Sequence, residues 1–245
     1  MNYCAIDFGH TNYKIAFIEN GNIILFQKNS YNDRLIFDDL IIKIKSMGCE
    51  KILCCNVLNE NIINSIISDF PPDMKNILEF FSSEDCQKHI SLAYKDDVKR
   101  LGADRALNLV GASVKTKNDL IVIDAGTATT IDYLDSNKNH IGGIILPSKN
   151  LIDNIFHEML DFDFSEELLS SDIFSNNTRS CIENGSSISA YYAINNILDK
   201  MLESKDSVVE IYVTGGNAKD IIDNCNYPLI HVESLLFDGL VVLKG

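Results

Sequence analysis

The sequence predicts an α/β protein with two duplicated domains, and two observations carry this prediction. Short apolar runs typical of strands alternate with segments whose apolar residues recur every three or four positions, as they do in helices. In addition, residues 120–135 repeat the pattern of residues 3–19, because Ile123-Asp124-x-Gly126 matches Ile6-Asp7-x-Gly9. A repeat of about 115 residues is too long for a solenoid and indicates a duplicated domain. We place the domains at residues 1–116 and 117–245, with the boundary in the short polar segment KTKND.

The elements of the first half follow from apolar spacing and turn residues. They are a meander of three strands at residues 3–9, 13–19 and 23–27, a helix at 33–47, a strand at 51–58, a helix at 59–68 that ends before two prolines, and a helix at 101–112. The last helix carries Asp104 and Arg105 in its first turn, where the helix dipole stabilises an acid.

The second half repeats the meander and then continues with helices and strands. The expected elements are two strands within residues 120–135, a strand at 141–146, a helix at 187–198, a strand at 208–213 followed by TGGNA and a helix, a strand at 227–232 and a C-terminal helix from about residue 234. The glycines of TGGNA leave backbone exposed, so a flat nucleoside could pack there beside the start of a helix.

The composition excludes several classes of function. The formal net charge of −14 would repel a nucleic acid or an anionic membrane surface. No apolar stretch approaches the ~18 residues of a membrane span, and the N-terminal residues do not resemble a secretory signal. The seven cysteines form neither a CxxC pair nor a zinc-spaced cluster, which favours free thiols in a reducing cytoplasm. The sequence also lacks a Walker A motif, a GxGxxG motif and a catalytic Cys/His signature.

The two Asp-x-Gly turns have the chemistry of a phosphate-binding site. Glycine allows backbone N–H groups to approach a ligand closely, and the Thr and Asn side chains that follow each glycine add hydroxyl or amide groups. Asp7 and Asp124 offer hard oxygen ligands for Mg²⁺ or a monovalent cation, and Lys14 offers a point charge for phosphates.

Taken together, the motifs resemble those of the type III pantothenate kinases, a family of the actin/hexokinase/Hsp70 superfamily. The matching pieces are DFGHTNYK at 7–14, LGADR at 101–105, DAGTATTID at 124–132, GGIILPS at 142–148, Thr178 before an ENG turn at 183–185, and TGGNA at 214–218. They follow the family's order and spacing over nearly the whole chain. The resemblance implies two ribonuclease-H-like (actin-like ATPase) domains with a cleft between them.

The resemblance also implies a reaction, its cofactors and its site residues. The reaction is ATP-dependent phosphorylation of pantothenate to 4'-phosphopantothenate, the first step of coenzyme A biosynthesis, with Mg²⁺ and with K⁺ or NH₄⁺. It implies ATP binding by Asp7, Phe8, Gly9, His10, Thr11, Asn12, Tyr13, Lys14 and Thr127. It implies pantothenate binding by Tyr94, Gly102, Ala103, Asp104, Arg105 and Thr178. Asp104 would be the general base, Asp124 would bind the monovalent cation, and Asp7 would hold Mg²⁺, directly or through water.

The chain departs from the family pattern at a few positions. His10 replaces an asparagine, Ser148 replaces a glycine, Val98 replaces a proline, and the usual tyrosine before GADR falls on Lys95, one residue after Tyr94. These departures keep two alternatives open, a kinase of another small alcohol and a non-catalytic nucleotide-binding relative. The resemblance further implies a homodimer, for which the helix at 187–198 is a candidate interface, although a plain core helix fits its pattern equally well.

Overall fold

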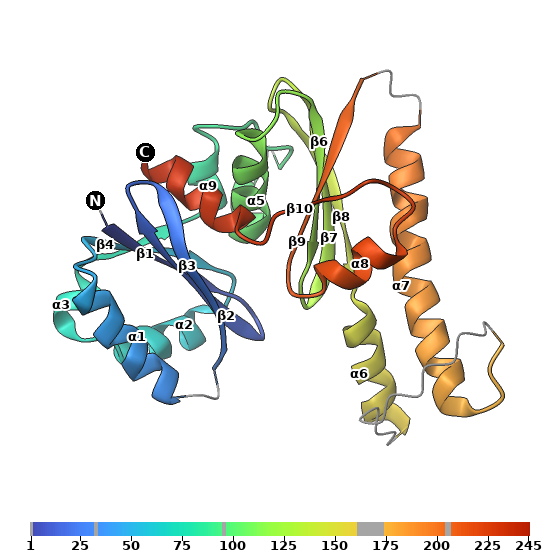
Figure 1. Cartoon of the computed structure of the whole chain (residues 1–245), viewed down its shortest axis with the longest axis horizontal. Helices are drawn as coiled ribbons and strands as arrows, with labels where there is room; N and C mark the ends of the chain where they lie inside the picture. Colours follow the sequence, from blue (N-terminus) through green and yellow to red (C-terminus); the bar gives the residue numbers. More distant parts are fainter. Residues whose placement is uncertain (1, 32–33, 95–96, 161–173, 204–206) are drawn as a thin grey trace. The chain divides into compact units, whose positions relative to one another are not determined.

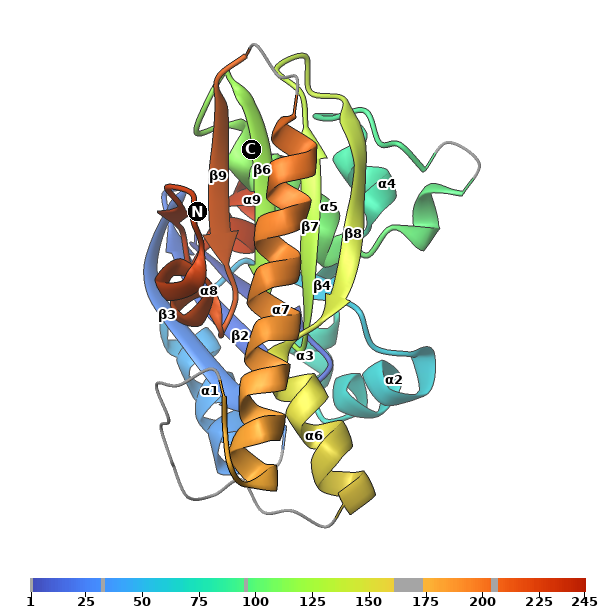
Figure 2. The same cartoon turned by 90° about the vertical axis from the view of Figure 1, so that its right-hand side faces the viewer.

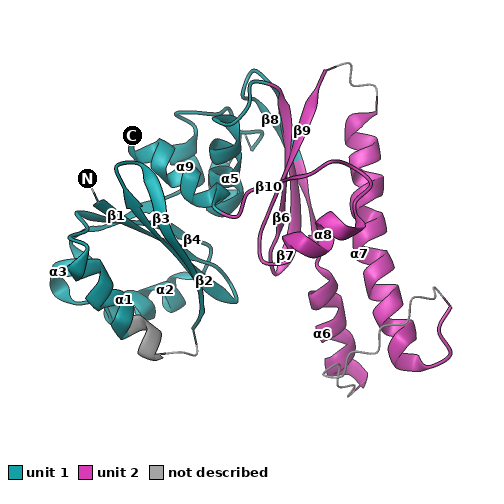
Figure 3. Ribbon diagram, viewed as in Figure 1, with its two compact units in different colours: residues 1–117, 134–142, 234–245 teal, residues 118–133, 143–233 magenta. Residues whose placement is uncertain are grey.

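The computed structural model describes residues 2–31, 34–94, 97–160, 174–203 and 207–245 (Figure 1). These residues form two compact units, which Figure 3 colours separately. Unit 1 comprises residues 1–117, 134–142 and 234–245, and unit 2 comprises residues 118–133 and 143–233. The chain therefore returns to unit 1 twice after leaving it. The two-domain division at residues 116 and 117 stays a prediction.

Unit 1 is built on a five-stranded sheet with the order β3-β2-β1-β4-β5. Its strands are β1 (Asn2–Phe8), β2 (Asn12–Glu19), β3 (Asn22–Ser30), β4 (Lys51–Asn56) and β5 (Leu78–Phe81). The first three form the antiparallel meander that the sequence predicts, and β4 and β5 add in parallel to β1. The helices of unit 1 are α1 (Arg34–Ser46), α2 (Glu60–Ser68), α3 (Pro72–Lys75), α4 (Ser83–Cys86), the 3₁₀ turn η1 (Val98–Arg100), α5 (Ala103–Ser113) and α9 (Leu235–Lys244).

The two faces of this sheet carry different residues, because side chains alternate along a strand. One face is an apolar core in which Ile6 and Phe8 of β1 pack with Ile44 of α1 and Ile63 of α2. Asp7 points to the opposite face. On that face the aromatic rings of Phe26 in β3 and Phe237 in α9 are in edge-to-face contact, with centroids 5.7 Å apart. The alternation therefore sends Asp7 to the α9 face and away from the apolar core.

Helices α5 and α9 approach each other backbone to backbone. A Cβ added at Gly239 of α9 would collide with the carbonyl group of Leu107 in α5, and a Cβ added at Gly111 of α5 would collide with the carbonyl group of Leu235. Only glycine fits at such a crossing, so the position of α5 depends on these two residues.

Unit 2 contains most of a second five-stranded sheet with the order β10-β9-β6-β7-β8. Its strands are β6 (Asp119–Ala125), β7 (Ala128–Leu134), β8 (His140–Pro147), β9 (Val209–Thr214) and β10 (Ile230–His231). When the strands are numbered from the start of each half, both sheets have the order third, second, first, fourth, fifth. This common order confirms the duplicated α/β architecture.

Within its described residues, unit 2 has the helices α6 (Lys149–Leu160), α7 (Thr178–Leu202) and α8 (Ala218–Asn224). Figure 2 shows α7 running along the face of the second sheet. Its buried residues recur every four positions from Ile182 through Ala190 to Leu198, and Ile194 and Leu198 join the apolar core of the unit. The helix expected at 187–198 is therefore the central part of a longer one.

Two local expectations are wrong. The ENG segment at residues 183–185 is not a turn but lies inside α7, where Asn184 Nδ2 donates to Ser175 Oγ at 2.8 Å. The strand expected at 227–232 is reduced to Ile230–His231, because Pro228 lacks the N–H that a ladder requires. Among the described residues, no helix is both long and apolar enough to cross a membrane.

The α5–α9 crossing gives a stability prediction. We expect Gly239→Ala to lower the free energy of unfolding by roughly 1–3 kcal/mol, because the new methyl group meets backbone that cannot move aside. The measurement is denaturant unfolding followed by circular dichroism.

The matched control is Gly185→Ala, also a glycine-to-alanine change within a helix. A Cβ at Gly185 has no atom within 4 Å, so alanine should be neutral or stabilise α7 by about 0.5–1 kcal/mol. Equal stability of the Gly239→Ala variant and the wild type would contradict the close crossing.

Candidate functional site

The turn between β1 and β2 is tight and is held by a tyrosine that the motif does not include. A Cβ at Gly9 would lie 2.9 Å from the carbonyl oxygen of Asn12, so the turn requires glycine. Tyr31 Oη donates to the Gly9 carbonyl oxygen at 2.9 Å. The centroid of the Tyr31 ring lies 5.3 Å from that of the Tyr13 ring. Burial raises the pKa of Tyr31, and nearby Asp7 and Tyr13 raise it further. The hydroxyl therefore remains a donor at neutral pH.

The residues of this turn divide into exposed and buried groups. His10 and Thr11 are exposed at its tip, whereas the side chains of Phe8 and Tyr13 lie in the apolar core. A ligand at this turn could therefore reach only the backbone of Phe8 and Tyr13.

Asp7 and Lys14 face each other on paired strands. They are register partners in the β1–β2 ladder, and Lys14 Nζ lies 3.7 Å from Asp7 Oδ2. The Asp7 carboxylate is buried, and the Lys14 ammonium is partly exposed. The turn thus presents a carboxylate and a cation together, which are groups that can serve a metal ion and a phosphate respectively.

The start of α5 carries a second group of polar side chains. Gly102 is the N-cap residue, and Asp104 Oδ1 accepts a hydrogen bond from the Arg105 backbone N–H at 2.8 Å. A Cβ at Gly102 would collide with the Asp104 carboxylate, so the observed position of this carboxylate requires glycine at residue 102. The Asp104 side chain therefore has a fixed place in the first turn.

Arg105 is buried, with 6% of its surface exposed, and it is oriented by an aromatic pair. Its Nη1 donates to Tyr94 Oη at 3.4 Å. The Tyr94 ring stacks on His140, with centroids 6.3 Å apart and planes 2° from parallel. The backbone of His140 bonds to Ser91 at 2.7 Å, which fixes the segment leading to Tyr94. Tyr94 therefore reaches Arg105 despite its one-residue shift from the family pattern.

Cys55 links the β1 turn to the start of α5. It is the register partner of Asp7 in the parallel β1–β4 ladder, so both side chains lie on the same face of the sheet. Burial raises the pKa of the Cys55 thiol well above its ordinary value, and the carboxylates of Asp7 and Asp104 raise it further. Both carboxylates thus lie within electrostatic range of one buried neutral thiol. The predicted phosphate turn and the predicted base therefore both belong to unit 1 and act on the same thiol.

In unit 2 the turn at residues 124–127 is held by two other segments. Asn217 bonds through its backbone N–H to the Ala125 carbonyl oxygen at 2.9 Å and through Nδ2 to the Gly126 carbonyl oxygen at 3.1 Å. Ser148 Oγ donates to the Thr127 carbonyl oxygen at 2.7 Å. A Cβ at Gly215 would lie 2.5 Å from the Ala125 backbone, so TGGNA packs directly against this turn. Asp124 is partly buried there, and Thr127 is exposed.

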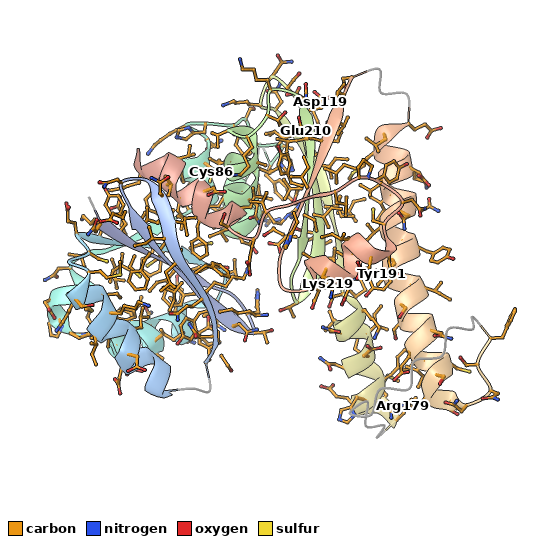
Figure 4. The ribbon with its side chains drawn as sticks, viewed as in Figure 1. Cys86, Asp119, Arg179, Tyr191, Glu210 and Lys219 are labelled. Carbon is orange, nitrogen blue, oxygen red and sulfur yellow. The ribbon has the colours of Figure 1, made fainter. Side chains whose placement is uncertain are left out.

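Thr178 is the first residue of α7 and is exposed. The side chain of Asn177 caps the helix by accepting from the Ser180 backbone N–H at 2.9 Å. Arg179, labelled at this end of α7 in Figure 4, pairs with Glu183 at 3.1 Å. Lys95 lies outside the described residues.

The sequence motifs do not mark several residues that hold a turn or lie against a proposed site residue. Tyr31, Cys55 and His140 each come from a segment that no motif marks, and only strand register and packing bring them to the site. The family pattern marks Ser148 only as a departure from its usual glycine. A signal for it did exist, because a serine directly before a helical segment is a common N-cap.

No cluster of three or more His, Cys, Asp or Glu side chains suited to a metal ion occurs in the described part of the chain. A single carboxylate such as Asp7 fits Mg²⁺ that keeps most of its ligands as water and phosphate oxygens.

The repeated sheet order and the glycine turns define a duplicated α/β fold of the actin-like ATPase class. A solved structure with this likeness is component A of (R)-2-hydroxyglutaryl-CoA dehydratase from Acidaminococcus fermentans. The match has a TM-score of 0.56 and 11% identity, and it covers 100% of this chain and 97% of that chain. At that identity the likeness shows the fold alone.

The family follows from the sequence comparisons. A family model described as type III pantothenate kinase matches residues 3–200. The type III pantothenate kinase of Hahella chejuensis is 33% identical over 179 residues, covering 70% of this chain and 71% of that protein. The enzyme of the same name from Finegoldia magna is 24% identical and covers 98% of this chain and 95% of that protein. The chain belongs to the type III pantothenate kinase family, whose members are phosphotransferases.

Proposed function

We propose that the protein phosphorylates pantothenate with ATP, giving 4'-phosphopantothenate and ADP in the first step of coenzyme A biosynthesis. One observation supports this proposal most strongly. Asp7 and Cys55 are register partners on one face of the sheet, and the carboxylates of Asp7 and Asp104 both raise the pKa of the buried Cys55 thiol. A phosphate-binding turn and a base must be neighbours for transfer to a hydroxyl group.

In the proposed reaction each group has a separate task. The acceptor hydroxyl oxygen forms a bond to the γ-phosphorus while the bond from that phosphorus to the β–γ bridging oxygen breaks, and ADP leaves. Asp104 accepts the hydroxyl proton as the new bond forms. Arg105, buried and oriented by Tyr94, pairs with the carboxylate of pantothenate. Gly102, Ala103 and Thr178 complete the proposed acceptor site.

The nucleotide end uses the two turns. Residues 7–14 and Thr127 bind the phosphates, with Lys14 as the positive charge. Asp124 holds a monovalent cation, K⁺ or NH₄⁺, and Asp7 holds Mg²⁺, directly or through water. When bound, these cations neutralise the charge of the transferring phosphoryl group. The proposal places the enzyme in the cytoplasm, without a nucleic acid or membrane partner.

The first test is a coupled ADP-release assay with pantothenate, run with and without K⁺. We expect ADP formation that requires pantothenate and rises at least several-fold when K⁺ is added, since an anionic substrate pair in an acidic protein needs cations. A panel of other small alcohols tests the alternative acceptor. Turnover with one of them and none with pantothenate would overturn the substrate assignment, and nucleotide binding without any turnover would favour the non-catalytic alternative.

The second test concerns the base. We expect Asp104→Asn to abolish ADP formation with pantothenate, because an amide cannot accept the proton, while circular dichroism and the unfolding midpoint remain those of the wild type. Asp97→Asn is the matched control, since Asp97 is exposed and pairs only with Arg100 at 3.1 Å in the described structure. Near-wild-type turnover of Asp104→Asn would show that Asp104 is not the base.

We also propose a homodimer. Strand β8 lies at the edge of the second sheet with Ile141 and Ile145 each 60% exposed, and Tyr192 of α7 is 68% exposed. Apolar side chains that gather into one exposed patch mark association surfaces, and we propose that these residues belong to one. We expect light scattering to give about twice the 27.4 kDa of one chain. A monomer at all concentrations tested would remove the proposal.

A further inference from the structure

Ser148 joins two elements of unit 2 through one hydroxyl group. Its Oγ donates to the Thr127 carbonyl oxygen at 2.7 Å and accepts from the Leu151 backbone N–H at 3.2 Å. The residue is 4% exposed, so water does not compete freely for either bond. The first bond reaches the turn at 124–127, and the second caps helix α6. We infer that Ser148 is a positioning residue that fixes this turn for nucleotide binding, an inference that rests on the proposed function.

The hydrogen bonds that hold the carbonyl groups of this turn also fix the directions in which its N–H groups point. In a trans peptide the C=O and the following N–H point in opposite directions. Bonds to the carbonyl oxygens of Gly126 and Thr127 therefore also set the directions of the Thr127 and Ala128 N–H groups. Phosphate oxygens are bound by such N–H groups, so the geometry of the turn affects nucleotide affinity directly.

Ser148 and Asn217 hold neighbouring carbonyl groups from different segments. Asn217 comes from the loop before α8 and contacts the Ala125 and Gly126 carbonyl oxygens, whereas Ser148 precedes α6 and contacts Thr127. Glycine, the usual residue of the family at this position, has no side chain with which to make the Thr127 bond. The serine therefore adds a restraint of its own on the Thr127 carbonyl group.

The test compares Ser148→Ala with Ser148→Thr in the full chain. We expect Ser148→Ala to raise the KM for ATP and the K⁺ concentration for half-activation by about five- to tenfold, the effect of losing one buried hydrogen bond. The KM for pantothenate should change less than about twofold, because the two Ser148 hydroxyl bonds go to the turn and to α6 and neither reaches residues 102–105 or Thr178. Ser148→Thr keeps the hydroxyl and should restore the KM for ATP to within about twofold of the wild type.

A matched control separates positioning from helix capping. Asn59 caps α2 by accepting from the Ile62 backbone N–H at 3.0 Å, and it is exposed. Asn59→Ala therefore removes a cap bond without touching either turn. We expect it to lower the unfolding midpoint and to leave the KM for ATP unchanged.

Two results would overturn the inference. One is an unchanged KM for ATP in Ser148→Ala, and the other is an equal loss of affinity for ATP and pantothenate that Asn59→Ala reproduces. Calorimetric titration of ATP into the same variants needs no acceptor, so it tests Ser148 even if the wild-type chain does not phosphorylate pantothenate. If the wild-type chain is inactive toward pantothenate and Ser148→Ala binds ATP more weakly than the wild type, pantothenate is not the substrate. The positioning role of Ser148 then still stands.

Discussion

The close crossing of α5 and α9 is the contact on which the rest of unit 1 depends. At Gly111 and Gly239 the two helix backbones touch, and no side chain larger than hydrogen fits between them. Helix α5 carries Asp104 and Arg105 at its first turn, so this crossing also sets where the carboxylate and the guanidinium lie. The last helix of the chain thereby fixes the residues proposed to do the chemistry. A backbone contact is suited to this task because it leaves little freedom to relax.

The proposed site needs positive charge although the protein as a whole is acidic. The chain has 14 more acidic than basic side chains, yet the proposed ligands are anions. The two cations of the proposed site are close to carboxylates, since Lys14 lies 3.7 Å from Asp7 and Arg105 follows Asp104 directly. Each cation is thus held in place by a neighbour of opposite sign or by an aromatic hydroxyl. A site of this kind depends on bound cations for the remaining charge neutralisation.

The two glycine turns are restrained in the same way by different residues. Tyr31 donates to the Gly9 carbonyl oxygen in unit 1, and Asn217 and Ser148 donate to the carbonyl oxygens of the second turn. Glycine allows the tight backbone of each turn. A hydrogen-bond donor from another segment of the same unit then holds the carbonyl group of the turn in one orientation. Both halves carry the Asp-x-Gly motif, whereas the donors that hold each turn come from different places in the two halves.

The sequence by itself determined the α/β class, the duplication and the meander strands, because alternation and turn residues are local signals. It also marked Asp7, Asp104 and the glycine turns, since those residues carry recognisable chemistry. Only the tertiary structure decided that Asp7 and Asp104 both raise the pKa of the Cys55 thiol, that Tyr94 reaches Arg105, and that Ser148 holds the second turn. These relations join residues from different segments. They depend on strand register and helix packing, which no local pattern specifies.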